Sequence, residues 1–178
     1  MGGEMDLVSK VKELAKKVYE ELGGFGYINE KEYEHALAYE LKENGLKYLQ
    51  QVQVDLMYKD KFLKHGVVDL IVFDEKEEEA ILVELKATKS EMESDAVDQI
   101  YKYYNAVKSS PTFPRIIADK VKCGLVINWF SPTAQRKMFK SQVEQEEEEI
   151  KFDLEKWKQE LQDFKIIEIR MEKKKGQK

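Results

Sequence analysis

The feature that most constrains this chain is a pair of apolar segments that each carry charge in their interior. Residues 67–73 read VVDLIVF and contain Asp69, and residues 80–87 read AILVELKA and contain Glu84 and Lys86. Nearly continuous apolar runs of this length are typical of strands in the middle of a sheet. Because burying an unpaired charge is costly, these groups must face solvent at a sheet edge or converge on one another or on a metal ion.

Side-chain alternation along a strand limits where the three charged groups can lie. Glu84 and Lys86 are two residues apart, so they project from the same face, about 7 Å from each other. If the two strands are hairpin neighbours, Asp69 lies opposite that pair. The spacing alone is a weak signal, since a Glu and a Lys two apart on an exposed strand usually form a solvated ladder. The apolar flanks favour a shared site.

A cluster of two acids and one lysine predicts a particular chemistry. The two carboxylates and the backbone carbonyl of Leu85 offer the hard oxygen ligands that Mg²⁺ prefers, and we expect Mn²⁺ to substitute for it. Lys86 would stand beside the attacking water and stabilise the charge that develops on a phosphodiester. Gln99 and Tyr103, one turn apart on the following helix, are expected to reach the same end of the sheet. The alternative is that these two residues only pack a helix face on the sheet.

The remaining periodicity predicts an α/β chain with the element order αβββαβ. Helical spacing indicates helices over 7–22, 33–41 and 96–107, and apolar alternation or continuity indicates strands over 52–58, 62–73, 80–87 and 123–129. The last of these strands follows a helix, so it is expected to run parallel to an earlier strand. An extra helix over 146–162 and a strand over 165–171 are expected to follow. We expect one domain over 1–178, with a core over 7–130 and an extension over 131–178.

Composition narrows the classes of protein that remain. Cys123 is the only cysteine, so neither a disulfide nor a zinc finger is expected, and an intracellular setting, cytoplasmic or nuclear, is the simplest interpretation. No apolar run approaches a membrane span of roughly 20 residues, so no membrane partner is expected. The net charge of −5 argues against coating nucleic acid by bulk electrostatics. Lysines such as Lys59, Lys64 and Lys102 either form a local basic face or are scattered for solubility.

Several segments resemble the GxxExxY family of PD-(D/E)XK nuclease-like proteins. They are the stretch from Val18 to Asp60 and the strings VVDLIVF, LVELKAT, DQIYKYYNAV and CGLVINW. The resemblance covers most of the chain. It implies a restriction-endonuclease-like fold with a central mixed sheet flanked by helices. It also implies a nuclease site built from a strand-borne acid, an E-x-K pair and a helix glutamine, which match Asp69, Glu84, Lys86 and Gln99.

The E-x-x-Y element of that family matches Glu30 and Tyr33, and its acid is thought to approach the metal from the helix. One extra residue before Glu30 departs from the family spacing. Glu34 and Glu40 therefore stay open as candidates for the helix-borne acid. Among aromatic residues, Tyr33 and Tyr103 are the ones expected to contact substrate.

These patterns are consistent with three functions. The first is a magnesium-dependent nuclease that acts on DNA. The second is a nuclease-fold module that binds nucleic acid or a protein partner without cutting, which the acidic charge balance motivates. The third is an assembly protein that forms homo-oligomers or binds a partner through the charged C-terminal extension.

Overall fold

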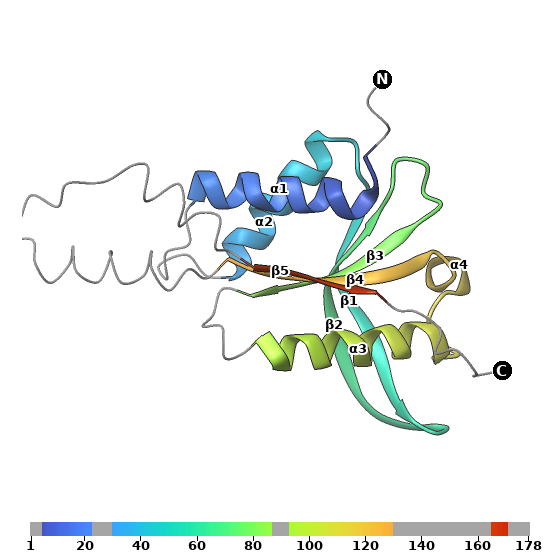
Figure 1. Ribbon diagram of the computed structural model, residues 1–178. Coiled ribbons are helices and arrows are strands. Elements are labelled where there is room, and N and C mark those ends of the chain that lie inside the picture. The colour runs from blue at the N-terminus through green and yellow to red at the C-terminus, as the bar shows by residue number, and fades with distance from the viewer. Residues whose placement is uncertain (1–4, 23–29, 87–92, 130–164, 171–178) are drawn as a thin grey trace, which may run out of the picture.

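The computed structural model describes residues 5–22, 30–86, 93–129 and 165–170, which form a mixed sheet with helices on both faces (Figure 1). The strand order is β1-β2-β3-β4-β5. The strands are β1 (Tyr48–Tyr58), β2 (Lys61–Phe73), β3 (Ala80–Lys86), β4 (Val121–Asn128) and β5 (Lys165–Arg170). β1, β2 and β3 form an antiparallel meander, β4 runs parallel to β3, and β5 pairs antiparallel with β4.

Helices cover the two faces of this sheet. α1 (Leu7–Leu22) and α2 (Glu30–Glu43) lie on one face, and α3 (Glu93–Ser109) lies on the other (Figure 1). The expected order αβββαβ and the parallel crossover into β4 are confirmed. The strand expected over 165–171 is also confirmed, as β5. The helix expected over 146–162 lies outside the described residues. Among the described residues, no helix is long and apolar enough to cross a membrane.

Local sequence signals explain where two of the helices begin or end. The Ser9 N–H donates to Asp6 Oδ1 at 2.7 Å, so Asp6 caps α1 and satisfies one of the donors that a helix start leaves open. After α2, Gly45 has a φ of 74°, a left-handed conformation that glycine adopts without steric cost. The Leu46 N–H then donates to the Leu41 carbonyl at 2.9 Å. That bond closes the helix end and turns the chain into β1.

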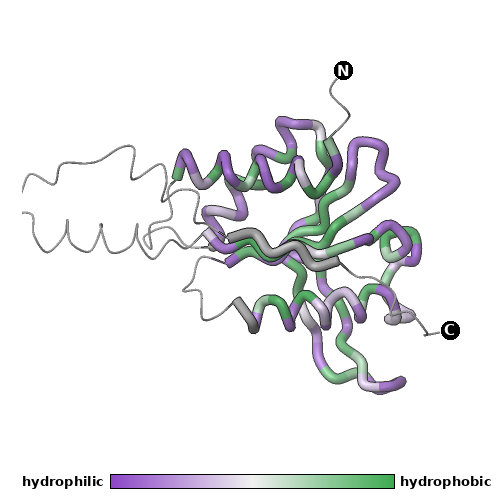
Figure 2. Tube along the Cα trace, in the orientation of Figure 1, coloured by the Kyte–Doolittle hydropathy of each residue, from purple (hydrophilic) through white to green (hydrophobic). Residues whose placement is uncertain are grey.

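Two apolar cores separate on the two sides of the sheet. Leu37 of α2 packs with Val83 and Leu125 on one side, whereas Ile100 of α3 packs with Leu82 on the other. Figure 2 shows hydrophobic colour along the central strands and hydrophilic colour at the loops. β3 is buried along nearly its whole length. The position of any charged group in this strand is therefore tightly determined by the residues packed around it.

One short helix was not expected from the sequence. α4 (Arg115–Ala118) follows α3 and leads into β4. Its four residues are too few to show helical periodicity, which needs a window of about 11 residues or more. Lys108 Nζ donates to the Ala118 carbonyl at 2.6 Å, and the Arg115 guanidinium donates to the Lys108 carbonyl at 2.6 Å. The helical turn is thus held by hydrogen bonds with α3 and is not indicated by a periodic pattern in its own sequence.

The β1–β2 hairpin changes the face that it presents to the helices part way along its length. Gln51 has a φ of 51°, which interrupts the alternation of side chains along β1. The ladder pairs Gln50 with Leu70 and then Val52 with Val68, and Gln51 and Asp69 are not paired between them. Leu70 consequently packs in the α1–α2 core, whereas Val68 packs under α3.

The far end of the hairpin corrects one expectation about β1. Val52, Val54, Leu56 and Tyr58 were expected to share one buried face. Val54 is 2% exposed and its neighbours at 52 and 56 pack against the α3 core, but Tyr58 is 60% exposed. The hairpin continues past α3 (Figure 1), so its end has no layer to cover it.

Candidate active site

Asp69 and Glu84 meet where the ladder between β2 and β3 ends. The last pair of this ladder is Leu70 with Val83, and one further step sets Asp69 across from Glu84. At this step the carboxylates bond to the backbone of the neighbouring strand. The Asp69 N–H donates to Glu84 Oε1 at 3.2 Å, and the Leu85 N–H donates to Asp69 Oδ2 at 2.8 Å. Each acid is therefore fixed by the strand that carries the other.

Burial makes ionisation of these acids costly. Glu84 is 3% exposed. Burial raises the pKa of Asp69, while hydrogen bonds from the Leu85 N–H and the Gln51 amide and the charge of Lys86 act to lower that pKa. An opposite charge close to a carboxylate favours its ionised form. A cation bound between the two acids would thus offset the free-energy cost of ionising them.

Gln51 links a third carboxylate to this pair. Its Nε2 donates to Glu34 Oε1 and, at 3.3 Å, to Asp69 Oδ1. Glu34 lies on α2 and is 5% exposed. Burial raises the pKa of Glu34, the Gln51 hydrogen bond lowers it, and the nearby charge of Asp69 raises it further. An acid from the helical layer is therefore connected to the strand acids by one amide.

The sequence reasoning missed Gln51. In an alternating strand a glutamine reads as a solvent-facing residue, and its role depends on a left-handed backbone that pattern alone does not reveal. A signal was nevertheless present. Gln50 and Gln51 are two consecutive polar residues, which breaks the period of two and indicates a slip in alternation.

An open cleft of about 670 Å³ brings the expected strand and helix residues together. Asp69, Glu84 and Lys86 line it from the sheet, and Gln99 and Tyr103 line it from α3. Glu84 and Lys86 thus share a face, as the spacing predicted. The residues at this cleft come from β1, β2, β3 and α3, which follow one another along the chain.

The α3 side of the cleft is fixed by Tyr103. Gln99 Nε2 donates to the Tyr103 hydroxyl at 2.6 Å. Burial raises the pKa of that hydroxyl, and a hydrogen bond with the Val67 backbone acts to lower it. A Cβ at Gly66 would lie 2.5 Å from Tyr103 Cε1, so glycine is what lets the ring lie against β2. Tyr103 therefore ties Gln99 to the strand that carries Asp69.

The other expected site residues differ in how they relate to the cleft. Glu30 begins α2, and its side chain lies outside the described residues. Glu40 forms an ion pair with Lys17 of α1 at 3.1 Å. Of the acids on α2 whose side chains are described, Glu34 is therefore the one joined to Asp69. Leu85 presents its N–H to Asp69, and its side chain is 1% exposed.

Tyr33 is part of the core. It is 1% exposed and stacks on Trp129, with ring centroids 4.9 Å apart and an interplanar angle of 8°. Burial raises the pKa of Tyr33 to about 12. The ring is thus covered by protein and packs between α2 and the end of β4.

The carboxylates that the structure describes at the cleft fit a small divalent cation that binds few protein ligands. Among the residues that the structure describes, no group of three or more His, Cys, Asp or Glu side chains is arranged to hold a metal ion. Mg²⁺ is commonly bound by one or two carboxylates, with water and substrate phosphate completing its shell. An ionised carboxylate has about four acceptor positions, and the hydrogen bonds described for Asp69 use two of them. Asp69 and Glu84 therefore suit Mg²⁺.

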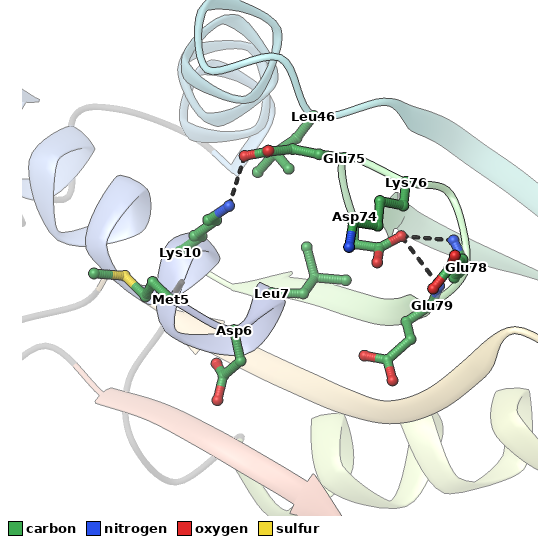
Figure 3. A pocket seen from close by; sticks show the side chains of 10 residues that line it. All are labelled: Met5, Asp6, Leu7, Lys10, Leu46, Asp74, Glu75, Lys76, Glu78 and Glu79. Atoms are coloured by element: carbon green, nitrogen blue, oxygen red, sulfur yellow. Dashed lines mark hydrogen bonds and ion pairs between the residues drawn. The ribbon is translucent and has the colours of Figure 1, made fainter. Parts of the chain in front are cut away.

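A second hollow, of about 240 Å³, lies between the start of α1 and the β2–β3 turn (Figure 3). Two of its acids, Asp74 and Glu75, have structural partners. Lys10 pairs with Glu75 at 2.6 Å, and Asp74 Oδ1 accepts the N–H groups of Glu78 and Glu79 at 2.7 and 3.1 Å. These contacts shape the turn and tie it to α1. They do not combine acids with a strand-borne lysine as the cleft does.

Comparison with known proteins bears on the cleft directly. A family model described as the PD-(D/E)XK nuclease superfamily matches residues 5–141. The match spans every cleft residue named above. A search of curated proteins finds no match.

Proposed function

Since the chain belongs to the PD-(D/E)XK nuclease superfamily, whose members are mostly metal-dependent nucleases, we propose that it is a magnesium-dependent nuclease that hydrolyses DNA. One observation carries this proposal. The carboxylates of Glu84, which is buried, and of Asp69, which is half-buried, come from neighbouring strands and lie side by side in an open cleft that Lys86 also lines. A purely structural use of three ionisable groups would not require an opening to solvent.

The metal in this proposal would be held by Asp69, Glu84 and the Leu85 carbonyl, with Mn²⁺ able to replace Mg²⁺. When bound, such an ion polarises a phosphate oxygen and lowers the pKa of a coordinated water. The buried acids are suited to this role because the cation offsets the cost of ionising them. Without the cation, the hydrogen bonds from the Leu85 N–H and the Gln51 amide lower the pKa of Asp69, which burial raises.

Each remaining residue has a distinct part in the proposed reaction. The Lys86 ammonium stabilises the negative charge that grows on the phosphate as water attacks. Gln99 uses one amide hydrogen for Tyr103, and its other amide hydrogen is directed to a phosphate oxygen. Tyr103 positions Gln99 against β2 and takes no part in bond making. Glu34 acts through Gln51 as the helix-borne acid.

The proposal extends to the subfamily and to the domain. The E-x-x-Y element at Glu30 and Tyr33, with the strand motifs, supports membership of the GxxExxY family. One domain over 1–178 is supported by β5, because this strand from the extension pairs with β4 of the core.

Cleavage assays test the proposal. We expect the purified protein to cut single- or double-stranded DNA with Mg²⁺ or Mn²⁺ and to be inert with EDTA. Asp69→Asn should abolish cleavage, and Lys86→Met should lower the rate by roughly 10²–10³-fold, the usual effect of removing one charge-stabilising group. Asp119→Asn, an exposed acid after α4, is the matched control and should cut normally. A protein inert on DNA with either metal would contradict the proposal.

The alternative is a silent nuclease-fold module that binds nucleic acid or protein. The observation in its favour is that the described residues contain no cluster of three metal-ligating side chains. Calorimetric titration with Mn²⁺ separates the two functions. A site that takes up Mn²⁺, and loses it in Asp69→Asn, supports the enzyme, whereas the absence of any binding supports the module.

A further inference from the structure

The β1–β2 hairpin carries an unusual surface at its free end. We name residues 57–63 the arm. Nine large apolar side chains are exposed among the described residues, and three of them, Tyr58, Phe62 and Leu63, lie on the arm, with exposed fractions of 60, 51 and 62%. Figure 1 shows that this end of the hairpin runs beyond α3. Exposed apolar groups that gather in one place mark an interaction surface.

The charge of the arm differs from that of the chain. Lys59 and Lys61 flank one acid, Asp60, and Lys64 follows directly after the arm. The whole chain has a net charge of −5, so this basic segment stands out locally. Lys59 Nζ lies 5.6 Å from the centroid of the Tyr58 ring. Aromatic rings and ammonium groups are therefore interleaved on the same exposed turn.

The arm is continuous with the candidate active site. The cleft that contains Asp69 and Glu84 is also lined by Leu56, Lys64 and Lys102. A neighbouring hollow of about 350 Å³ is lined by the same three residues together with Met57 and Leu63 of the arm. Because the two hollows share these three lining residues, the arm lies next to the cleft that contains the carboxylates.

From this arrangement we infer that the arm holds a single strand of nucleic acid as it leaves the cleft, with Tyr58 and Phe62 stacked on bases and the lysines on phosphates. The inference rests on the proposed function for the class of ligand. Proteins that bind single strands combine a basic groove with exposed aromatic rings. A base in a duplex is already stacked on both faces, whereas an unpaired base has a face to offer. Exposed rings thus favour single-stranded over double-stranded substrate.

A binding assay without metal tests the arm apart from catalysis. A fluorescein-labelled oligo(dT) of about 20 nucleotides, longer than the site of a single-strand-binding domain, is titrated with the full chain in EDTA, and binding is followed by anisotropy. Tyr58→Ser/Phe62→Ser should weaken binding by at least roughly 5- to 150-fold, which is the loss expected for stacking on only one of the two bases. Tyr39→Ser/Ile116→Ser is the control, because these residues are 61 and 70% exposed and lie on α2 and α4. The control should bind as the wild type does.

The lysines are tested by the salt dependence of the same binding. Lys59→Gln/Lys61→Gln should reduce the slope of log affinity against log salt by roughly 0.7 for each phosphate that is no longer neutralised. Lys16→Gln/Lys42→Gln, exposed on α1 and α2, should leave the slope unchanged. A matching duplex should be affected less by the aromatic variant than the single strand is. Equal losses for both forms of DNA would overturn the assignment to single strands.

Two outcomes separate this inference from the proposed function. Hydrolysis of bis(4-nitrophenyl) phosphate with Mn²⁺ reports on the cleft alone, because this diester is too small to reach the arm, and the arm variants should retain it. In the first outcome, the wild type shows no hydrolysis, and its binding of oligo(dT) still depends on the arm. The proposed function is then wrong, and the inference about the arm is supported. If Asp69→Asn abolishes hydrolysis and the arm variants bind oligo(dT) normally, the arm is a docking surface for protein and the inference fails.

Discussion

At the scale of single residues, Gln51 connects a buried acid, Glu34, with a half-buried one, Asp69. Its amide donates to both Glu34 and Asp69, and in each case the hydrogen bond lowers a carboxyl pKa that burial raises. Neither acid can be understood without this amide. A residue that contacts no substrate can therefore set the pH range in which the site works.

The first prediction follows from this geometry. Gln51→Leu removes the donor, so the pKa of Asp69 and of Glu34 should rise, and the acid limb of the pH–rate profile should move to higher pH. The maximal rate should fall roughly 10- to 100-fold, as it does when groups behind metal ligands are removed. Gln50→Leu, on the neighbouring exposed residue, is the control. An unmoved acid limb in Gln51→Leu would show that the amide does not tune the acids.

Residue patterns predict part of this site and not the rest. Asp69, Glu84 and Lys86 share the cleft because strand alternation and a hairpin follow from local sequence. The link through Gln51 depends on a φ of 51°, a left-handed conformation that a residue other than glycine rarely adopts. Tyr33 was expected to contact substrate, yet its ring completes a stack with Trp129. An apolar partner that arrives from another element is not visible in the local pattern.

At the scale of elements, α3 lies unusually close to the sheet. A Cβ at Gly124 of β4 would lie 2.6 Å from Ile100 Cδ1, well inside van der Waals contact. The same helix carries Gln99, so its distance from the sheet sets how far that amide reaches into the cleft. Packing between two elements is in this way coupled to the geometry of the site.

Substitution at this contact tests the coupling. Gly124→Ala should lower the free energy of unfolding by about 1–3 kcal/mol, the usual cost of overpacking a core. Ile100→Val removes the Cδ1 atom, so the double variant should be more stable than the sum of the two single effects predicts. Urea unfolding of the four proteins measures this difference. Additive effects would mean that α3 shifts freely and that the contact does not restrain it.

Element positions were the most predictable part of the fold, with two informative exceptions. Long periodic segments such as α1 and β3 have the expected type and nearly the expected bounds. α4 was missed because four residues hold too little periodicity. The buried face of β1 was predicted to extend to Tyr58, which is too far, because alternation does not indicate where the covering helix ends. Both exceptions depend on neighbouring elements and not on the local sequence.

At the scale of the whole molecule, the candidate site lowers the free energy of unfolding in the absence of metal. Burial raises the pKa of Asp69 above its unfolded value. Between the unfolded and folded pKa values the native state binds more protons, so stability falls as pH rises through this window and remains lower above it. The half-buried carboxyl of Asp69 thus lowers the free energy of unfolding once the pH is above this window.

The last prediction uses this cost to detect the metal through folding alone. Without metal at neutral pH, Asp69→Asn should unfold at a higher temperature than the wild type, and the gain should vanish as pH falls below about 3.9, the carboxyl pKa of an unfolded chain. With Mg²⁺ at about 100 times its dissociation constant, the wild type should gain about 2.7 kcal/mol. For a chain of this size that gain corresponds to roughly 5–10 °C.

The variant and the control should then respond in opposite ways to the metal. Asp69→Asn has lost a ligand, so Mg²⁺ should leave its melting temperature unchanged, and the order of stabilities should invert as metal is added. Asp119→Asn keeps the site and should follow the wild type in both conditions. Calorimetric melting scans measure all three proteins. If Mg²⁺ stabilises Asp69→Asn as strongly as the wild type, the ion binds elsewhere, and these carboxylates are buried for a reason other than metal binding.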